Sequence, residues 1–197
     1  MALTLTYAGR YQTPRAQHVD GEILAACQRG DVEAFRQLFE GYRTRVYSIA
    51  VHFSGDAAIA HDITQQVFVT VYTSIGKFRH EAQFDTWLYR IVVNACLHEH
   101  RRRKRFVPLE GIAEPRTDAD RQTFEDAFIR REEAIAVRRA IATLKPKLRL
   151  ALVLKHLEGL PYDEIAVVLN CSAGTVASRL NRARSALARK LAYLRSS

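Results

Sequence analysis

Apolar residues recur at steps of three and four along almost the whole chain, and this spacing constrains the fold most strongly. A first series lies on one face of an amphipathic helix and consists of Ala34, Leu38, Tyr42, Val46 and Ile49. Runs that alternate between apolar and polar residues, as strands require, are missing, and there are only 9 glycines and 5 prolines in 197 residues. The pattern predicts an all-α protein.

The break in this series predicts where helices begin and end. The triplet Ser54-Gly55-Asp56 interrupts the first helix and starts a second, whose apolar stripe is Ile63, Val67, Val71 and Ile75. We expect the second helix to end at Gly76, because glycine is common just after a helix. A short connection leads to a further helix over about 85–103.

A change of composition divides the chain into two parts. Residues 107–131 contain prolines and more acidic than basic residues, which predicts an acidic, flexible linker. We expect two small helical domains, over 21–106 and 132–197, and a loose tail over 1–20. Within the second domain the spacing predicts helices near 132–143, 146–158, 162–169 and 172–194.

The C-terminal domain carries the pattern of a helix-turn-helix motif. Asn170 falls where the chain must turn sharply, and asparagine tolerates the left-handed backbone better than most residues. Ser172 is a good N-cap for the following helix, and the small side chain of Ala166 allows the two helices to cross closely. These features predict a short turn between two packed helices.

The second helix of this motif has one polar face that suits DNA. It carries Thr175, Ser178, Arg179 and Arg182 opposite the apolar stripe, with Ser172 at the start of the helix. From residue 175 to 195 there are six basic residues and no acidic one, and the whole chain has a net charge of +9. Such a helix can enter a major groove, although it could also be a solvated helix of an ordinary bundle. We favour DNA binding.

A second basic surface is predicted in the N-terminal domain. The connection before helix 85–103 contains Lys77, Phe78, Arg79 and His80, and one face of that helix carries Trp87, Arg90, Asn94 and Arg101. Aromatic and basic side chains placed together suit single-stranded nucleic acid, because bases stack on rings while cations meet phosphates. Trp87 alone could equally belong to the core.

The helix over 62–75 has a polar face without catalytic partners. This face carries Asp62, Gln65, Gln66 and Val69, roughly opposite the apolar stripe. The residues alone leave two interpretations open, a protein-binding face or simple solvation.

Several motifs together resemble region 2 and region 4 of the extracytoplasmic-function (ECF) sigma factors of the sigma-70 family. The region 2 motifs are Ala60-His-Asp-Ile-Thr-Gln-Gln-Val-Phe68 and Phe84-Asp-Thr-Trp-Leu-Tyr-Arg-Ile-Val-Val-Asn94. The region 4 motifs are Glu158-Gly-Leu-Pro-Tyr-Asp-Glu-Ile-Ala166 and Gly174-Thr-Val-Ala-Ser-Arg-Leu-Asn-Arg-Ala-Arg184. The similarity covers about residues 30–194 in the expected order.

The resemblance implies a transcription initiation factor that needs no cofactor or metal and catalyses no reaction. It implies that Asp62, Gln65 and Phe68, with the neighbouring Gln66 and Val69, dock on the clamp helices of the RNA polymerase β′ subunit. The loop after residue 76 and the face carrying Trp87 would read and melt the −10 element of promoter DNA. The polar face of the helix carrying Arg182 would read the −35 element.

Further partners follow from the resemblance alone. The acidic linker would thread channels of core RNA polymerase, with the β subunit as a second contact, and an anti-sigma factor would regulate the chain. The free protein is expected to bind promoters weakly, and the polymerase-bound form tightly. His61, His98 and Ala177 depart from residues common in the family, and Ala177 puts the −35 sequence preference in question.

Two other classes of function are compatible with parts of the sequence. A helix-turn-helix repressor or activator would bind DNA without polymerase, but the aromatic and basic helix of the N-terminal domain counts against it. An enzyme with a metal held by Cys96, His98 and His100 is disfavoured, because residues two and four apart on one helix do not converge on a single face.

The remaining features point to a reducing compartment. The three cysteines, Cys27, Cys96 and Cys171, are sparse and form no close pair, which argues against a disulfide framework. No secretory signal and no long apolar run is evident, so we expect a cytoplasmic protein without membrane insertion.

Overall fold

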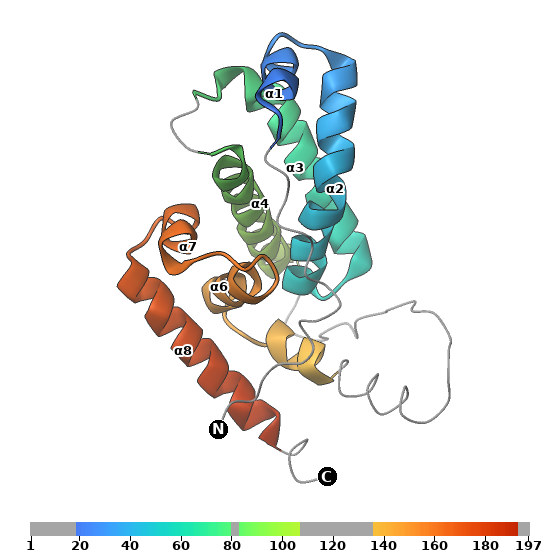
Figure 1. The fold of residues 1–197 in the computed structure, drawn as a ribbon. Helices are drawn as coiled ribbons and strands as arrows, with labels where there is room; N and C mark the ends of the chain where they lie inside the picture. Colours follow the sequence, from blue (N-terminus) through green and yellow to red (C-terminus); the bar gives the residue numbers. More distant parts are fainter. Residues whose placement is uncertain (1–18, 80–82, 107–135, 193–197) are drawn as a thin grey trace, which may run out of the picture.

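The computed structural model describes residues 19–79, 83–106 and 136–192, and these residues are helical with short connections (Figure 1). The all-α prediction is therefore confirmed. The predicted tail over 1–20, apart from its last two residues, and the predicted linker over 107–131 lie outside the described residues. We call residues 19–106 the N-terminal unit and residues 136–192 the C-terminal unit.

Aspartates begin the first three helices. Asp20 precedes α1 (Gly21–Gln28), Asp31 precedes α2 (Val32–Ser54) and Asp56 precedes α3 (Ala57–Ser74). Each carboxylate accepts hydrogen bonds from backbone N–H groups of the first turn, which have no partner within the helix. Gly55 ends α2 with a φ of 75°, so the predicted break at residues 54–56 is confirmed.

The end of α3 differs from the prediction. The α-helix stops at Ser74, and the chain tightens into the 3-10 turn η2 (Ile75–Lys77) before Gly76 can act as a terminator. The side-chain amide of Gln28 donates hydrogen bonds to the carbonyl groups of Ile75 and Phe78, at 3.3 and 2.8 Å. This contact from α1 stabilises the turn and could not be read from the local sequence.

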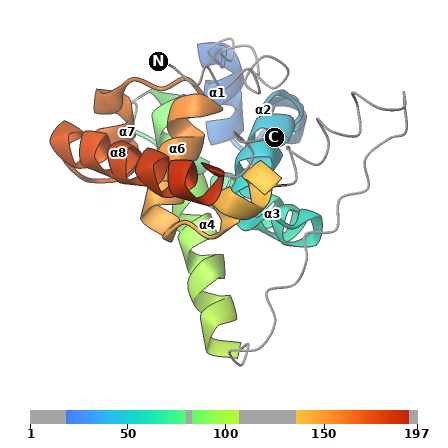
Figure 2. The same cartoon turned by 90° about the horizontal axis from the view of Figure 1, so that it is seen from below.

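The last helix of the N-terminal unit, α4 (Phe84–Phe106), packs against α2 and α3. Its buried residues include Phe84, Leu88 and Val92. Its C-terminal turns extend beyond the other helices (Figure 2). There the five consecutive basic residues 101–105 are all exposed.

The C-terminal unit contains a helix over 136–142, then α6 (Pro146–His156), α7 (Tyr162–Val168) and α8 (Ala173–Lys190). Asn170 has a φ of 46° and Ser172 caps α8 by accepting a hydrogen bond from the N–H of Thr175. Both predictions for the turn of the helix-turn-helix motif are confirmed. Val176, Leu180 and Ala183 form the buried side of α8.

The two units pack directly against each other. α6 lies against α2 and α4, and α7 lies against α4 (Figures 1 and 2). One apolar core therefore runs from Leu24 in α1 to Leu180 in α8. None of the helices in the described ranges is long and apolar enough to span a bilayer.

Candidate nucleic-acid and protein interfaces

The exposed face of α3 carries most of the residues predicted to bind a protein. Asp62, Gln65, Gln66 and Val69 are all exposed, and Val69 is 52% exposed although it is apolar. Phe68 is different, because it is only 5% exposed and its ring stacks edge to face on Phe39 at 4.7 Å. Phe68 therefore lies mostly beneath the outer surface of α3, where it lines the groove described next, and its part in polymerase binding stays a prediction.

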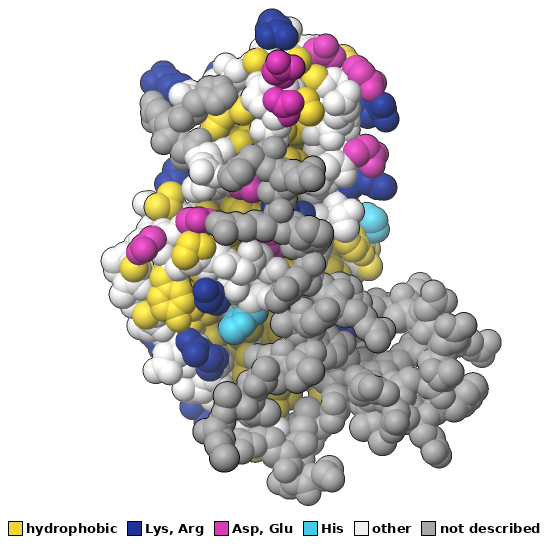
Figure 3. Space-filling view, in the orientation of Figure 1, with side chains coloured by type: hydrophobic (Ala, Val, Ile, Leu, Met, Phe, Trp, Pro, Cys, Tyr) yellow, Lys and Arg dark blue, Asp and Glu magenta, His cyan; other side chains and the backbone are white. Residues whose placement is uncertain are grey.

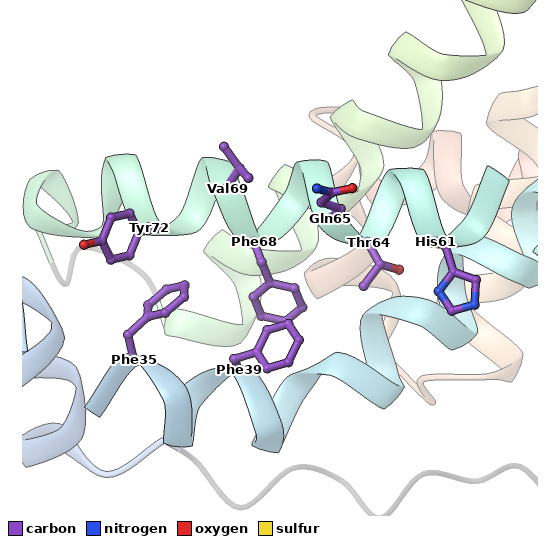
Figure 4. Close-up of a pocket in the computed structure, with 8 residues that line it drawn as sticks. All are labelled: Phe35, Phe39, His61, Thr64, Gln65, Phe68, Val69 and Tyr72. Atoms are coloured by element: carbon purple, nitrogen blue, oxygen red, sulfur yellow. The ribbon is translucent and has the colours of Figure 1, made fainter. Parts of the chain in front are cut away.

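Next to this face lies an apolar groove of about 530 Å³ between α2 and α3 (Figure 4). Its lining residues come from both helices and are Phe35, Phe39, His61, Thr64, Gln65, Phe68, Val69 and Tyr72. The ring of Tyr72 is 53% exposed and meets Phe35 edge to face at 4.9 Å. The groove is not predicted by the sequence pattern. Its one local signal is the pair Val69 and Tyr72, two apolar residues spaced by three on the polar side of α3.

Position 61 holds a histidine, which departs from the residue common in the family, and this difference affects the groove. The imidazole of His61 lies on the rim of the groove and stacks on Tyr47, with ring centroids 4.7 Å apart. An acidic side chain at that position would carry a negative charge beside an apolar surface. The histidine therefore makes this rim less acidic.

The predicted single-strand surface is divided between exposed and buried residues. Lys77, Arg79, Asn94 and Arg101 are exposed, whereas His80 lies outside the described residues. Phe78 is only 8% exposed and packs on the rings of Phe84 and Trp87, with centroids 5.9 and 5.2 Å away. The ring of Phe78 therefore lies within this aromatic cluster, and its contact with DNA stays a prediction.

Trp87 lies at the edge of this aromatic cluster and is half-buried. Three residues further along α4, Arg90 is exposed, and its Nε donates a hydrogen bond to the backbone carbonyl of Val167 in α7, at 3.1 Å. The C-terminal unit thus contacts the predicted nucleic-acid face of α4.

The residues predicted to form the polar face of α8 are all at least partly exposed. Ser172 and Arg182 are exposed, and Thr175, Ser178 and Arg179 are partly exposed. Arg182 donates hydrogen bonds to the carbonyl and hydroxyl oxygens of Ser178, and Arg179 donates to the sulfur of Cys171 at 3.4 Å. The charged side chains of α8 are all Arg or Lys, and those seen over this helix in Figure 3 are basic.

The three candidate metal ligands lie in different environments. Cys96 is fully buried, His98 is exposed and His100 is half-buried near the ring of Phe53. Burial raises the pKa of the Cys96 thiol to about 12, so this group is protonated at neutral pH. In the part of the chain that the structure describes, no three His, Cys, Asp or Glu residues are arranged to hold a metal ion.

Both units match known protein families. Residues 38–106 match the family described as sigma-70 region 2, and residues 134–187 match sigma-70 region 4.

Curated relatives are similar over almost their full length. An RNA polymerase sigma-H factor of Pseudomonas aeruginosa is 35% identical over 183 residues, which cover 89% of this chain and 95% of the relative. The ECF RNA polymerase sigma factor SigM of Mycobacterium tuberculosis H37Rv is 38% identical over 182 residues, which cover 91% of this chain and 88% of the relative. The ECF RNA polymerase sigma-E factor of Escherichia coli K12 is 33% identical over 192 residues, which cover 89% of this chain and 95% of the relative.

Two solved structures share the fold. CnrH, solved in complex with the cytosolic domain of CnrY, has a TM-score of 0.66 at 24% identity and covers 89% of this chain. The sigma factor RpoE of Bartonella quintana, solved with the anti-sigma factor NepR, has a TM-score of 0.65 at 23% identity and covers 81%. In each case the match spans 98% of the solved chain.

Proposed function

The chain belongs to the ECF sigma factors of the sigma-70 family, which are transcription initiation factors and not enzymes, and from this we propose which of its surfaces binds which partner. The face of α3 binds core RNA polymerase, the face of α4 binds the −10 element and the face of α8 binds the −35 element. The observation that carries the proposal is the helix-turn-helix of α7 and α8. Its second helix is buried along one side and carries no acidic residue.

The α3 face suits a helical protein partner. Polar side chains on its surface can form directed hydrogen bonds, while Val69 and Tyr72 leave apolar area uncovered beside them. A groove that is apolar in the middle and polar at the rim is the usual anatomy of a protein interface. We assign this surface to the clamp helices of the polymerase β′ subunit.

The α3 assignment predicts two variants with weak polymerase binding. Asp62→Ala removes a charge from the surface, and Val69→Asp places one where an apolar contact is needed. We expect each to weaken the affinity for core polymerase about tenfold or more, as central interface residues do. The measurement is biolayer interferometry of the full chain on immobilised core enzyme.

Arg43→Ala is the matched control for this measurement. Arg43 is exposed on α2, where it forms an ion pair with Glu40 one turn away at 2.8 Å. Equal affinities of the wild type, the control and both α3 variants would contradict the α3 assignment. If all of these proteins also bind promoter DNA normally in the absence of polymerase, the result would favour a regulator that binds DNA by itself.

The α4 face suits an unstacked DNA strand. Trp87 presents part of an indole ring, Arg90 and Arg101 supply positive charge, and Asn94 can pair with a base edge. Removing a base from the stack costs a few kcal/mol, which stacking on the ring and phosphate contacts can offset. Because Phe78 is buried, Trp87 is the more accessible of these two aromatic groups for stacking.

The −35 assignment is tested on α8. Arg182→Ala removes an exposed guanidinium from the polar face, and a lost arginine contact to DNA costs about 1–3 kcal/mol. We therefore expect a loss of about tenfold in promoter-dependent transcription by the reconstituted holoenzyme. Arg29→Ala is the control, because Arg29 is an exposed arginine at the end of α1 in the other unit.

The template for this test is a genomic library transcribed in vitro, since the promoter sequence is not known beforehand. Sequencing of the transcripts then reports the promoter motif together with activity. Equal activity of Arg182→Ala and wild-type holoenzyme on every promoter would contradict the role of α8.

Regulation by an anti-sigma factor is the second part of the proposal. The related fold of RpoE was solved with the anti-sigma factor NepR, and that of CnrH with the cytosolic domain of CnrY. We infer that such a partner competes with polymerase for the α3 face. Val69→Asp should then weaken both interactions, whereas Arg182→Ala should leave both unchanged.

A further inference from the structure

A buried polar network joins the two units. Glu158, in the connection between α6 and α7, accepts hydrogen bonds at its Oε2 atom from Nε of Arg45 and from the hydroxyl of Tyr89. The tyrosine contact is 2.7 Å long. Arg45 also lies 3.6 Å from the Asp85 carboxylate, which accepts a hydrogen bond from Tyr42. We call Arg45, Tyr89 and Glu158 the latch, because they lie far apart in sequence and on both sides of the interface.

The latch exists only while the two units stay together. The side chain of Glu158 is 0% exposed and that of Arg45 is 6% exposed. Burial also raises the pKa of Tyr89, so its hydroxyl stays protonated as the donor to Glu158. When the C-terminal unit moves away, a charge of each sign must be rehydrated in its own unit.

The latch specifies this arrangement without holding it permanently. Buried ion pairs lose much of their attraction to the cost of leaving water, although removing one partner alone is strongly destabilising. Here one nitrogen of Arg45 and one oxygen of Glu158 are buried without a hydrogen-bond partner. An incompletely satisfied pair of this kind favours one geometry while leaving room for a binding partner to open it.

The closed arrangement covers part of the proposed DNA surface. The hydrogen bond from Arg90 to the carbonyl of Val167 places α7 on the face of α4 that also carries Trp87 and Asn94. A DNA strand that follows this face and contacts Arg90 would meet α7. The C-terminal unit must therefore move before α4 can present the whole face.

We propose that the free chain is autoinhibited by the latch, which holds the C-terminal unit over the Arg90 face of α4. This proposal rests on the function assigned to α4 above. Polymerase and promoter bind the open form, so the apparent affinity of the free chain for DNA is reduced by the fraction of molecules that is open. Breaking the latch raises that fraction.

The direct test measures the distance between the units. Spin labels are attached to Thr73→Cys on α3 and Ser185→Cys on α8, both of which are exposed, in a Cys171→Ser background. Cys27 and Cys96 are buried and stay unlabelled. Double electron–electron resonance should give one narrow distance distribution for the wild type and a broad, longer distribution for Glu158→Ala.

The control is Glu33→Gln, which breaks an exposed ion pair with Arg36 inside α2 and should leave the distribution narrow. Circular dichroism checks that each variant keeps its helices. If Glu158→Ala loses its helices, the distance measurement is made on Tyr89→Phe instead. This variant removes one hydrogen bond from the latch and keeps the aromatic ring. Identical distributions for the wild type and a folded latch variant would overturn the proposal.

A binding measurement separates this inference from the proposed function. The probe is a fluorescein-labelled dT12 strand, titrated with the full chain and followed by anisotropy. We expect latch variants to bind about tenfold more tightly than the wild type, and Arg90→Ala to cancel the gain. If latch variants show longer distances between the spin labels but no tighter DNA binding, the units open as proposed and the DNA role of α4 is contradicted. If the distances between the labels do not change, the latch proposal is contradicted whatever α4 binds.

Discussion

Arg149 connects the ends of two helices through its guanidinium group. From α6 it donates hydrogen bonds to the carbonyl of Phe53 in the last turn of α2, and to those of Ala142 and Leu144 at the end of helix 136–142. Carbonyl groups at helix C-termini have no partner within the helix and carry partial negative charge. Burial lowers the pKa of Arg149 to about 10, so it stays charged at neutral pH.

We predict that Arg149→Ala lowers the free energy of unfolding by about 3 kcal/mol, because two buried carbonyl groups and one partly buried carbonyl group lose a charged donor. Urea unfolding followed by circular dichroism measures this change. Lys147→Ala, at an exposed position of the same helix, is the control and should change stability by less than about 0.5 kcal/mol. A small effect at Arg149 would show that water replaces the guanidinium.

Histidine burial predicts how stability depends on pH. Burial lowers the pKa of His52, whose Nδ1 lies 2.7 Å from the carbonyl of Ser48, and also lowers the pKa values of His100 and His156. The unfolded chain therefore takes up protons near the ordinary value of 6.5, while the folded chain stays neutral to lower pH. Stability should be full above pH 6.5 and fall as the pH drops below it.

Urea unfolding at pH 7.5 and pH 5.5 tests the contribution of His52. We expect His52→Gln to reduce the stability lost between these two values, because one group that takes up protons on unfolding is gone. His98→Gln, at an exposed position of α4, is the control and should keep the wild-type loss. An unchanged loss in His52→Gln would contradict the role of His52.

At the scale of elements, the turn of the helix-turn-helix motif depends on one backbone conformation. Asn170 lies in the left-handed region with a φ of 46°, and the next N–H, of Cys171, donates to the carbonyl of Ala166 at 3.0 Å. A branched side chain in this region meets the backbone, at a cost of about 1–2 kcal/mol.

Asn170→Val should therefore destabilise the protein by about 1–2 kcal/mol and reorient α8 against α7. Asn170→Gly is the matched control, because glycine adopts this conformation without a steric cost and should be close to neutral. Urea unfolding gives the stabilities, and transcription from a −35-dependent promoter reports the orientation of α8. Equal stability of the valine and glycine variants would contradict the argument.

At the scale of the whole molecule, the two units share one core. Buried residues of α2 and α4, such as Ile49 and Leu88, belong to the same apolar cluster as Leu154 of α6 and Ile165 of α7. Units that share buried area and a buried ion pair are coupled in unfolding. The free chain therefore differs from two domains that are connected only by a tether.

We predict a single cooperative thermal transition, with calorimetric and van't Hoff enthalpies that agree. Differential scanning calorimetry of the full chain measures both. Arg45→Ala should separate the unfolding of the units, because it leaves Glu158 buried without its cation. Two transitions already in the wild type would contradict the shared core.

Local patterns were sufficient to predict most of the helices and the residue that caps α8. The stripes of α2, α3 and α8, the cap at Ser172 and the left-handed Asn170 all follow from interactions within a few residues. Local spacing also predicts which residues are exposed on the α3 and α8 faces, because a helix places residues three and four apart on one side.

Other features depend on contacts between distant residues. The burial of Phe68 and Phe78 is one example, because the ring of Phe39 packs on Phe68 and that of Trp87 packs on Phe78. Helical spacing shows which side of a helix is apolar, but it does not show how deeply a neighbouring element buries a residue at the edge of that side. The groove between α2 and α3 was missed for the same reason.

The sequence by itself determined the helices, their caps and the basic side of α8, because these depend on short-range spacing and charge. Only the tertiary structure decided that α7 lies on α4 and that Glu158 pairs with Arg45, 113 residues away. Nothing in the local sequence marks either residue as a partner. The pairing arises because folding brings two charges of opposite sign to the same buried place, where each needs the other.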